Sequence, residues 1–300
     1  MTTPVASFDC NALLQRPFAP VEQEWSESNS VLYALGCGLG DEPLNAAQLR
    51  FLYERSAGGL EALPTMANVL GYPGFWADQP DTGIDWRRLV HAEQAIVLHK
   101  PLPAAGRFIG QNRVTGIHDK GAEKGAILLQ ERTVCDAARG EILATVTQTT
   151  MLRGNGGFAA RTGQASLGAP LPAPHVMPGR EPDAICDVQT LPQAALIYRL
   201  SGDLNPLHAD PAVAEAAGFP RPILHGMATM GMAMHAVLRT LLGYDVRRVA
   251  GMRIRFTSPF MPGEVLRTEM WQSNDVISLR ARSLNRNTVV LDAGRVDLNS

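Results

Sequence analysis

The chain has 300 residues, of which 45% are hydrophobic and 19% are charged, so it can bury one large core or two of ordinary size. A net charge of −2 gives no electrostatic reason to expect nucleic acid or an anionic membrane as a partner. These values favour a globular protein that holds any phosphate-bearing ligand by local contacts.

Four cysteines, Cys10, Cys37, Cys135 and Cys186, lie far apart and show no zinc-site spacing. We therefore expect free thiols in a reducing compartment and no metal ion. The first ten residues lack the basic flank and long apolar run of a signal peptide, and the last residues are no peroxisomal signal. A bacterial-style cytoplasmic enzyme fits these features.

The first half of the chain contains four strand-like segments, at 95–99, 107–114, 126–134 and 142–149. Six glycines and five prolines then fall within the 29 residues from 154 to 182, which indicates an ordered or semi-ordered linker. We accordingly divide the chain into an N-terminal unit, 1–153, a linker, 154–182, and a C-terminal unit, 183–300.

The second half begins with helices and ends with strands. Asp210 and Pro211 start a predicted short helix that Gly218 ends. A longer helix, at about 226–242, is apolar nearly all round, so it should be buried, yet it is too short to span a membrane. Strand-like segments follow at 253–257, 265–271, 276–282 and 288–293. Helices before strands in each half predict two α+β units, each with a curved antiparallel sheet around a buried helix.

The two halves resemble diverged copies of one unit. Three short echoes occur in the same order, with offsets that shrink from 165 to 161 to 158 residues, and they pair 33–39 with 198–204, 63–67 with 224–228, and 101–103 with 259–262. Aligned on Tyr33 and Tyr198, the first half has Gly38 and Pro43 at the positions of Asp203 and His208. The first copy therefore has neither an acid nor a base there.

The segment from 198 to 208 reads Tyr-Arg-Leu-Ser-Gly-Asp-Leu-Asn-Pro-Leu-His and carries the chemistry of the chain. Pro206 forbids continued helix and pushes Asn205 towards extended geometry, which lets the side chains of Asp203 and His208 converge. A general base that works near neutral pH needs such a convergence. A plain capped turn is the alternative interpretation.

Together with 217–219 and 224–227, this segment resembles the signature of MaoC-like dehydratases, specifically the type-2, (R)-specific enoyl-CoA hydratases. The first half is similar to the double-hotdog members related to the hydratase domain of peroxisomal multifunctional enzymes, in 32–36, 53–54, 63–65, 89–94, 100–103, 119–121 and 156–158. The resemblance implies a double hotdog fold, reversible addition of water to trans-2-enoyl-CoA giving (3R)-3-hydroxyacyl-CoA, and no cofactor except coenzyme A as part of the substrate. We further expect a homodimer.

The resemblance also implies roles for particular residues. By this resemblance the catalytic residues are Asp203, His208 and Asn205, and the Gly226 amide would stabilise the oxyanion. Substrate and coenzyme A contacts are expected at His91, Ala92, Lys120, Leu204, Pro206, Leu207 and Phe256. Arg199 and Glu54 would support the active segment through salt bridges. His91-Ala92 departs from the His-Gly of many relatives, which narrows the room for ligand beside the backbone.

Several of these positions have plainer interpretations. Lys120 lies in a sequence typical of a turn, Arg199 suits a solvated helix face, and glycine at 226 suits a crowded helix start. His225 is expected to be structural, and Met227, Met230, Met232 and Met234 to be core packing.

Three other activities remain open on the sequence. The same dyad would serve a dehydratase for carrier-protein substrates or for small branched or dicarboxylic acyl-CoA. Thioester hydrolysis is performed by other hotdog proteins, and a non-catalytic acyl-CoA sensor would need a DNA-binding segment, for which no basic helix-turn-helix is found. We also expect the N-terminal unit, without its own dyad, to complete the pocket and hold the acyl tail.

Overall fold

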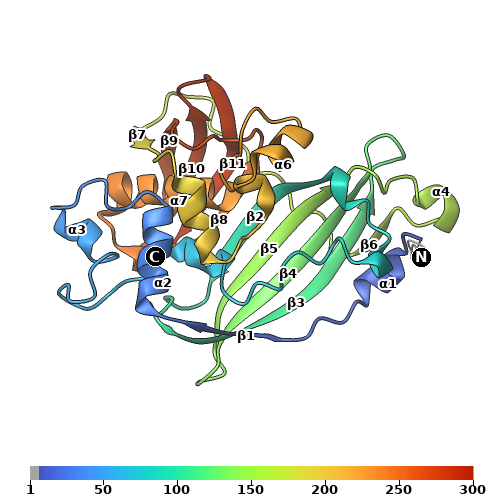
Figure 1. Cartoon of the computed structure of the whole chain (residues 1–300), viewed down its shortest axis with the longest axis horizontal. Coiled ribbons are helices and arrows are strands. Elements are labelled where there is room, and N and C mark those ends of the chain that lie inside the picture. Colours follow the sequence, from blue (N-terminus) through green and yellow to red (C-terminus); the bar gives the residue numbers. More distant parts are fainter. Residues whose placement is uncertain (1–6, 300) are drawn as a thin grey trace.

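The computed structural model describes residues 7–299, so the terminal residues on which part of the localisation prediction rests lie outside it. The described strands form one continuous antiparallel sheet in the order β1-β3-β4-β5-β2-β8-β11-β10-β9-β7, with the short β6 on β3 (Figure 1). Their bounds are β1 Val21–Trp25, β2 Leu89–Leu98, β3 Gly106–Asp119, β4 Ala126–Asp136, β5 Ile142–Leu152, β6 Ser166–Gly168, β7 Ala184–Gln189, β8 Val249–Phe256, β9 Val265–Ser273, β10 Val276–Ser283 and β11 Thr288–Leu298.

Most helices are short and pack on one face of this sheet. The α-helices are α1 Cys10–Leu14, α2 Glu27–Gly36, α3 Ala46–Leu49, α4 Ala159–Thr162, α5 Ala194–Tyr198, α6 Pro211–Ala216 and α7 Gly226–Val237. The 3-10 helices are η1 Pro64–Asn68, η2 Pro80–Thr82, η3 Trp86–Arg88, η4 Arg199–Ser201, η5 Pro206–His208 and η7 Val246–Arg248, and η6 Leu238–Leu242 is a π-helix.

The two halves of the sheet meet where β2 pairs with β8. At the centre of that ladder, Ala95 lies opposite Arg253, 158 residues further along, which is the smallest offset between the sequence echoes. The echoed tyrosines also meet, because the rings of Tyr33 on α2 and Tyr198 on α5 lie 5.7 Å apart. The halves are therefore related by an approximate twofold rotation, as expected of duplicated units that pair side by side.

The C-terminal unit wraps its sheet around α7, as the apolar sequence predicts. Every side chain from Ala228 to Val237 is buried, and Met230, Met232 and Met234 belong to the main core. The helix continues into η6 and ends at Gly243, in left-handed geometry. The predicted buried helix is confirmed, and so is its position after the short helix α6.

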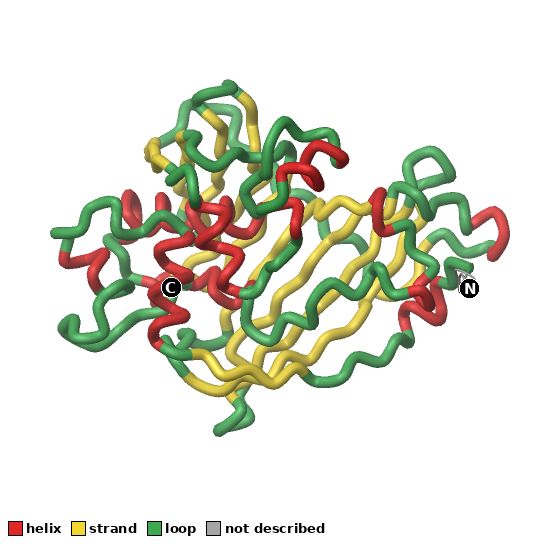
Figure 2. Tube along the Cα trace, in the orientation of Figure 1, coloured by secondary structure: helices red, strands yellow, loops and turns green. Residues whose placement is uncertain are grey.

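The N-terminal unit retains only one turn at the corresponding place. The turn η1 aligns with the start of α7, and residues 69–88 then leave the helical path and cross the open face of the N-terminal strands (Figure 2). This crossing segment lies close to the sheet, because Gly110 on β3 brings its backbone against that of Gly71. A side chain longer than hydrogen has no room at that contact.

The glycine-rich and proline-rich linker is ordered and touches both units. Its β6 pairs with β3 of the N-terminal sheet. Further along, His175 Nε2 lies 2.7 Å from Ser278 Oγ on β10, and Arg253 Nη1 donates to Ala173 O. The linker thus runs along the shared sheet from one unit to the other.

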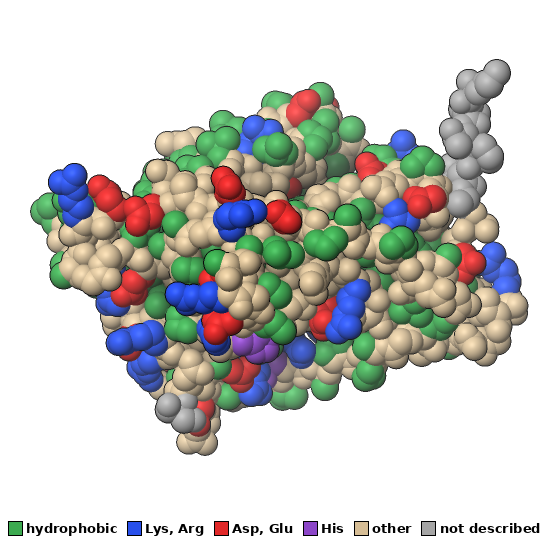
Figure 3. Space-filling model, turned by 90° about the horizontal axis from the view of Figure 1, so that it is seen from below, with side chains coloured by type: hydrophobic (Ala, Val, Ile, Leu, Met, Phe, Trp, Pro, Cys, Tyr) green, Lys and Arg blue, Asp and Glu red, His purple; other side chains and the backbone are tan. Residues whose placement is uncertain are grey.

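The surface shows no gathering of one kind of charge on the face seen from below. There, basic and acidic side chains alternate, with hydrophobic side chains scattered among them (Figure 3). Among residues 7–299, no helix is both long and apolar enough to cross a membrane.

We predict that Gly110→Ala lowers the free energy of unfolding by about 1–3 kcal/mol, because the added methyl overlaps the backbone of Gly71. Gly179→Ala is the matched control, since a methyl there meets nothing within 4 Å. Urea unfolding of both variants measures the difference. Equal stability would show that the crossing segment is not held in place by this contact.

Candidate active site

The segment from Tyr198 to His208 is built from two tight turns. The first, η4, ends at Gly202, whose φ of 118° lies in the left-handed region that favours glycine. In the second, η5, Asn205 is the N-cap and its Oδ1 accepts a hydrogen bond from Leu207 N at 3.0 Å. The two turns place Asp203 between them and bring His208 back towards it.

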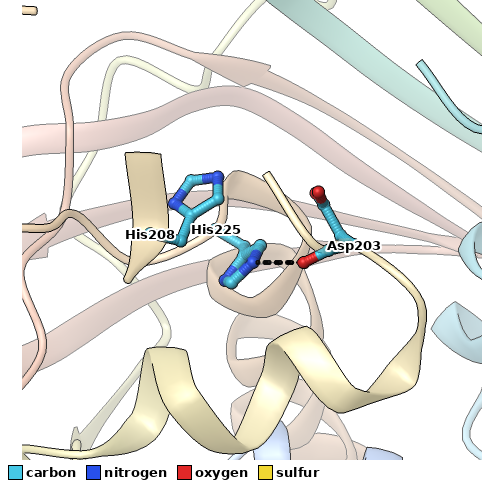
Figure 4. Close-up of side chains that lie close together, drawn as sticks. All are labelled: Asp203, His208 and His225. Atoms are coloured by element: carbon cyan, nitrogen blue, oxygen red, sulfur yellow. Dashed lines mark hydrogen bonds between the residues drawn. The ribbon is translucent and has the colours of Figure 1, made fainter. Parts of the chain in front are cut away.

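The side chains of Asp203, His208 and His225 converge on one point. One carboxylate oxygen of Asp203 and one ring nitrogen each of His208 and His225 lie within 4.8 Å of one another (Figure 4). Two hydrogen bonds of about 2.8 Å that meet at a water oxygen span roughly this distance. The predicted convergence of the acid and the imidazole is therefore present in the geometry.

The tautomer of neutral His208 follows from its other contact. Its Nδ1 lies 2.9 Å from Ile223 O, and a carbonyl oxygen only accepts, so Nδ1 carries the hydrogen. The lone pair is then on Nε2, which is the form that a general base requires. Burial lowers the pKa of His208, while the contact with Ile223 O and the charge of Asp203 act in the opposite direction. The imidazole is thus mainly neutral at pH 7.

His225 lies within the site, although the sequence indicated only a structural residue. Its ring stacks on that of His208 with 3.7 Å between centroids and 28° between planes. Its Nε2 donates to the carbonyl oxygen of Asp203 at 3.1 Å, drawn as the dashed line in Figure 4. Burial, followed by the charge on His208, lowers the pKa of His225 to about 4. It therefore remains neutral and holds the backbone of Asp203 in place.

The ligand atoms of Asp203, His208 and His225 are not oriented to bind one metal ion. Zinc binds imidazole nitrogens at about 2.0–2.1 Å along their in-plane lone pairs. Nearly parallel stacked rings direct those lone pairs side by side, so an ion midway between them would lie outside both ring planes. The arrangement suits hydrogen bonding to water better than coordination.

The start of α7 faces this site with free backbone donors. His225 is its N-cap and makes no side-chain capping bond, and the first backbone N–H held by the cap is that of Thr229. The amides from Gly226 to Ala228 precede it at the positive end of the helix. Gly226 is also needed sterically, because a Cβ there would lie 3.0 Å from the ring of Phe256. The steric and the oxyanion interpretations are compatible.

The N-terminal unit contributes His91 to the opposite wall. The pairing of β2 with β5 shifts register between His91 and Glu93, which leaves Ala92 in a β-bulge. His91 packs edge-on against Phe256 at 4.8 Å and its Nε2 lies 2.9 Å from Gln94 Oε1. Burial lowers the pKa of His91 to about 4, and the charge of Asp203 partly opposes this.

Tyr72, in the crossing segment, belongs to this site although no sequence motif marks it. Burial and the nearby charge of Asp203 raise its pKa to about 12, while Arg132 on β4 acts in the opposite direction. Tyr72 is therefore close to both charges. It stands at an irregular position in a loop, where no periodicity or motif marks it.

The other residues expected to contact the substrate lie on the active segment or in the β3–β4 turn. Leu204 and Pro206 are exposed and Leu207 is partly buried, all on the active segment. Lys120 is exposed in the β3–β4 turn, where Asp119 accepts from Gly121 N, and β5 lies between β4 and β2 in the sheet. This geometry matches the plain turn, and a role for Lys120 in holding coenzyme A stays a prediction.

Within residues 7–299, neither Glu54 nor Arg199 forms a salt bridge with the active segment. Glu54 is exposed and pairs with its sequence neighbour Arg55 at 3.9 Å, and the buried Nε of Arg199 has no hydrogen-bond partner. Glu54 follows α3 in a surface turn, whereas Arg199 lies beside His225 and helps to lower its pKa. Any effect of Arg199 on the site is therefore through charge rather than through an ion pair.

A duplicated sheet with one acid–imidazole pair and one central helix defines a hydratase or dehydratase of double hotdog type. Residues 175–293 match the MaoC-like domain and residues 24–154 match the MFE-2 hydratase 2 N-terminal domain. The chain belongs to the MaoC-like dehydratase family, in its enoyl-CoA hydratase 2 branch, and is a hydro-lyase.

Individual relatives support this placement. The chain is 36% identical to the peroxisomal enoyl-CoA hydratase 2 of Arabidopsis thaliana, over 99% of this chain and 98% of that one. It is 41% identical to the 3-hydroxyacyl-thioester dehydratase Y of Mycobacterium tuberculosis, over 85% and 84%. The crystal structure of a MaoC-like dehydratase from Phytophthora capsici superposes with a TM-score of 0.84, at 31% identity over 97% and 98%. The double hotdog fold is confirmed.

Three buried histidines predict that stability falls in mild acid. Burial lowers the pKa of His91, His225 and His235 to about 4, against about 6.5 in the unfolded chain. Below pH 6.5 the unfolded state binds more protons, so the free energy of unfolding falls as the pH is lowered from 6.5 towards 4. We expect each histidine to remove about 1–2 kcal/mol at pH 5.

Urea unfolding at pH 7 and pH 5 measures this loss, which should be smaller in His225→Asn than in the wild type. The exposed His99 provides the matched control, His99→Asn, with an unchanged pH dependence. The same dependence in both variants would contradict the neutral, buried state of His225.

The position of Asn205 predicts that it holds the turn rather than the water. Asn205→Ser keeps a side-chain oxygen for the N-cap and should retain hydratase activity within a few-fold, whereas Asn205→Ala should lose about 1 kcal/mol of stability. Initial rates and thermal unfolding measure the two effects. A large loss of kcat in Asn205→Ser, with the fold intact, would return the carboxamide to the catalytic group.

Proposed function

We propose that the chain is an (R)-specific enoyl-CoA hydratase that adds water reversibly to trans-2-enoyl-CoA and yields (3R)-3-hydroxyacyl-CoA. The observation that carries this proposal is the convergence of the Asp203 carboxylate and the His208 imidazole, within 4.8 Å of each other, beside the free amides of α7. The relatives' names support the reaction, and the motif in 203–208 supports its stereochemistry by resemblance.

In the forward direction, one water donates a hydrogen bond to the carboxylate of Asp203 and another to Nε2 of His208. As its oxygen attacks C3 of the enoyl group, one of its protons passes to this pair. Negative charge then develops on the thioester oxygen, where the Gly226 amide and the positive end of α7 stabilise the enolate. Return of the proton to C2 from the same side completes a syn addition.

The N-terminal unit would complete the pocket instead of repeating the chemistry. His91 and Tyr72 both belong to this unit, and both are close enough to Asp203 for its charge to shift their pKa. Positions 38 and 43 carry glycine and proline in place of the acid and base. One polypeptide would therefore contain one catalytic centre, with coenzyme A present only as part of the substrate.

We predict that Asp203→Asn lowers kcat for hydration of crotonyl-CoA by about 10²–10⁴-fold, because the variant loses the anionic acceptor for the water proton. Asp210→Asn is the matched control: Asp210 caps α6 through Ala212 N, and asparagine caps equally well. Loss of absorbance by the conjugated thioester measures the rate, and chiral analysis of the product measures the (R) configuration.

Undiminished turnover in Asp203→Asn would remove Asp203 from the mechanism. An (S) product would reject the stereochemical part of the proposal. Release of free coenzyme A, detected with a thiol reagent, would favour thioester hydrolysis in place of hydration.

A further inference from the structure

A narrow cavity lies beside the catalytic centre, between η1, the start of the crossing segment and the N-terminal strands. Six of the residues that line it carry polar groups: Asn68, Tyr72, Gln94, Gln130, Arg132 and Gln148. Most of the surface that faces the cavity is apolar, as in an ordinary ligand pocket, but an alkyl tail has no use for the charged group of Arg132.

The cavity adjoins the place where the reaction is proposed to occur. Met227, which also lines it, directly follows Gly226 at the start of α7. Tyr72 lies between the charges of Asp203 and Arg132 and is influenced by both. Gln94 contacts His91 on one side and donates to Asn68 Oδ1 on the other. The cavity therefore adjoins the start of α7, where the thioester is proposed to lie.

Arg132 is the unusual member of the lining. Its side chain is buried, with 5% of the residue exposed, and its Nη2 donates to the carbonyl oxygens of Ala67 and Asn68 at 3.2 and 2.6 Å. Its Nε has no hydrogen-bond partner within residues 7–299. Burial lowers its pKa to about 10, so the guanidinium stays charged at neutral pH.

No carboxylate of the described chain balances this charge. The guanidinium carbon of Arg132 lies 5.5 Å from the centre of the Tyr72 ring, and that phenol is neutral at pH 7. Glu131, the next residue on β4, pairs instead with the exposed Arg113. A buried cation is normally paired, because leaving it uncompensated is costly. The missing partner is therefore an anion from outside the chain.

Arg132 is the one cationic residue among those that line the cavity, and the amides beside it are largely engaged. Gln94 is engaged with His91 and Asn68, Gln130 Oε1 accepts from Trp76, and Gln148 donates to Thr150. A planar guanidinium with an unused edge matches a carboxylate in geometry as well as charge.

Resting on the proposed hydratase function, we propose that the preferred substrate is an enoyl thioester whose acyl chain ends in a carboxylate, bound by Arg132 in this cavity. Beyond the shared residues Tyr72, Gln130 and Gln148 lies a second, mainly apolar hollow lined by Phe75, Trp76 and Ile84. Arg132 lines only the first cavity, where the end of a methyl-ended chain would be buried against the guanidinium, which disfavours such a chain.

The test compares pairs of trans-2-enoyl-CoA substrates that share a chain length and end in either a carboxylate or a methyl group. The wild type should show a kcat/KM at least tenfold higher for the carboxylate member at one short or medium chain length. Arg132→Met, which preserves much of the side-chain volume, should reverse or abolish that ratio. Arg113→Met, which removes an exposed arginine on the neighbouring strand β3, should leave the ratio unchanged.

Arg132 also binds the end of η1, so its replacement could disturb the fold. A second variant therefore tests the cavity with Arg132 in place. Gln148→Leu leaves the guanidinium in place and makes the lining more apolar, so it should raise kcat/KM for methyl-ended chains relative to carboxylate-ended ones. A wild-type enzyme that prefers methyl-ended substrates at every length would overturn the proposal. Hydration of crotonyl-CoA tests the hydratase function separately, so the two failures are distinguishable.

Discussion

The pairing of β2 with β8 is the interaction on which the rest of the structure depends. It joins two five-stranded halves into one sheet and sets Glu93 of the first half opposite Arg255 of the second, where the side chains form an ion pair of 2.6 Å. Because the strands are antiparallel, the join also relates the halves by a rotation. His91 on β2 and Phe256 on β8 consequently meet beside the start of α7. The wall of the site is thus a direct result of how the sheet closes.

Much of this arrangement was predictable because it rests on local signals. Alternating apolar residues and turn residues marked the long strands, and the absence of charge before Arg239 marked α7 as buried. The Asp203–His208 segment was visible because Pro206 enforces a turn whatever surrounds it. The duplication was visible because the echoes keep their order. The tyrosine echo proved to be a physical contact between the two units.

What the sequence did not indicate depends on contacts between distant segments. The stacking of His225 on His208 needs the fold of residues 203–226, and Tyr72 lies in a loop without periodicity. Arg132 occurs in an ordinary strand pattern, where an arginine at an alternate position suggests a solvated face. It is buried instead because the crossing segment covers that face of the sheet. Glu54 pairs with its sequence neighbour Arg55 instead of the active segment, since sequence position alone does not determine distance in the fold.

The N-terminal unit has a single turn and a crossing segment where the C-terminal unit has a central helix, and the two arrangements differ in how readily they accept mutations during evolution. A helix of the length of α7 is bound to its sheet along its whole surface, so altering it disturbs a core. The segment 69–88 is mostly loop, and loops accept changes of length and residue at little cost in stability. The cover of this cavity can therefore vary while the strands beneath it and the turn that carries Asp203 stay as they are.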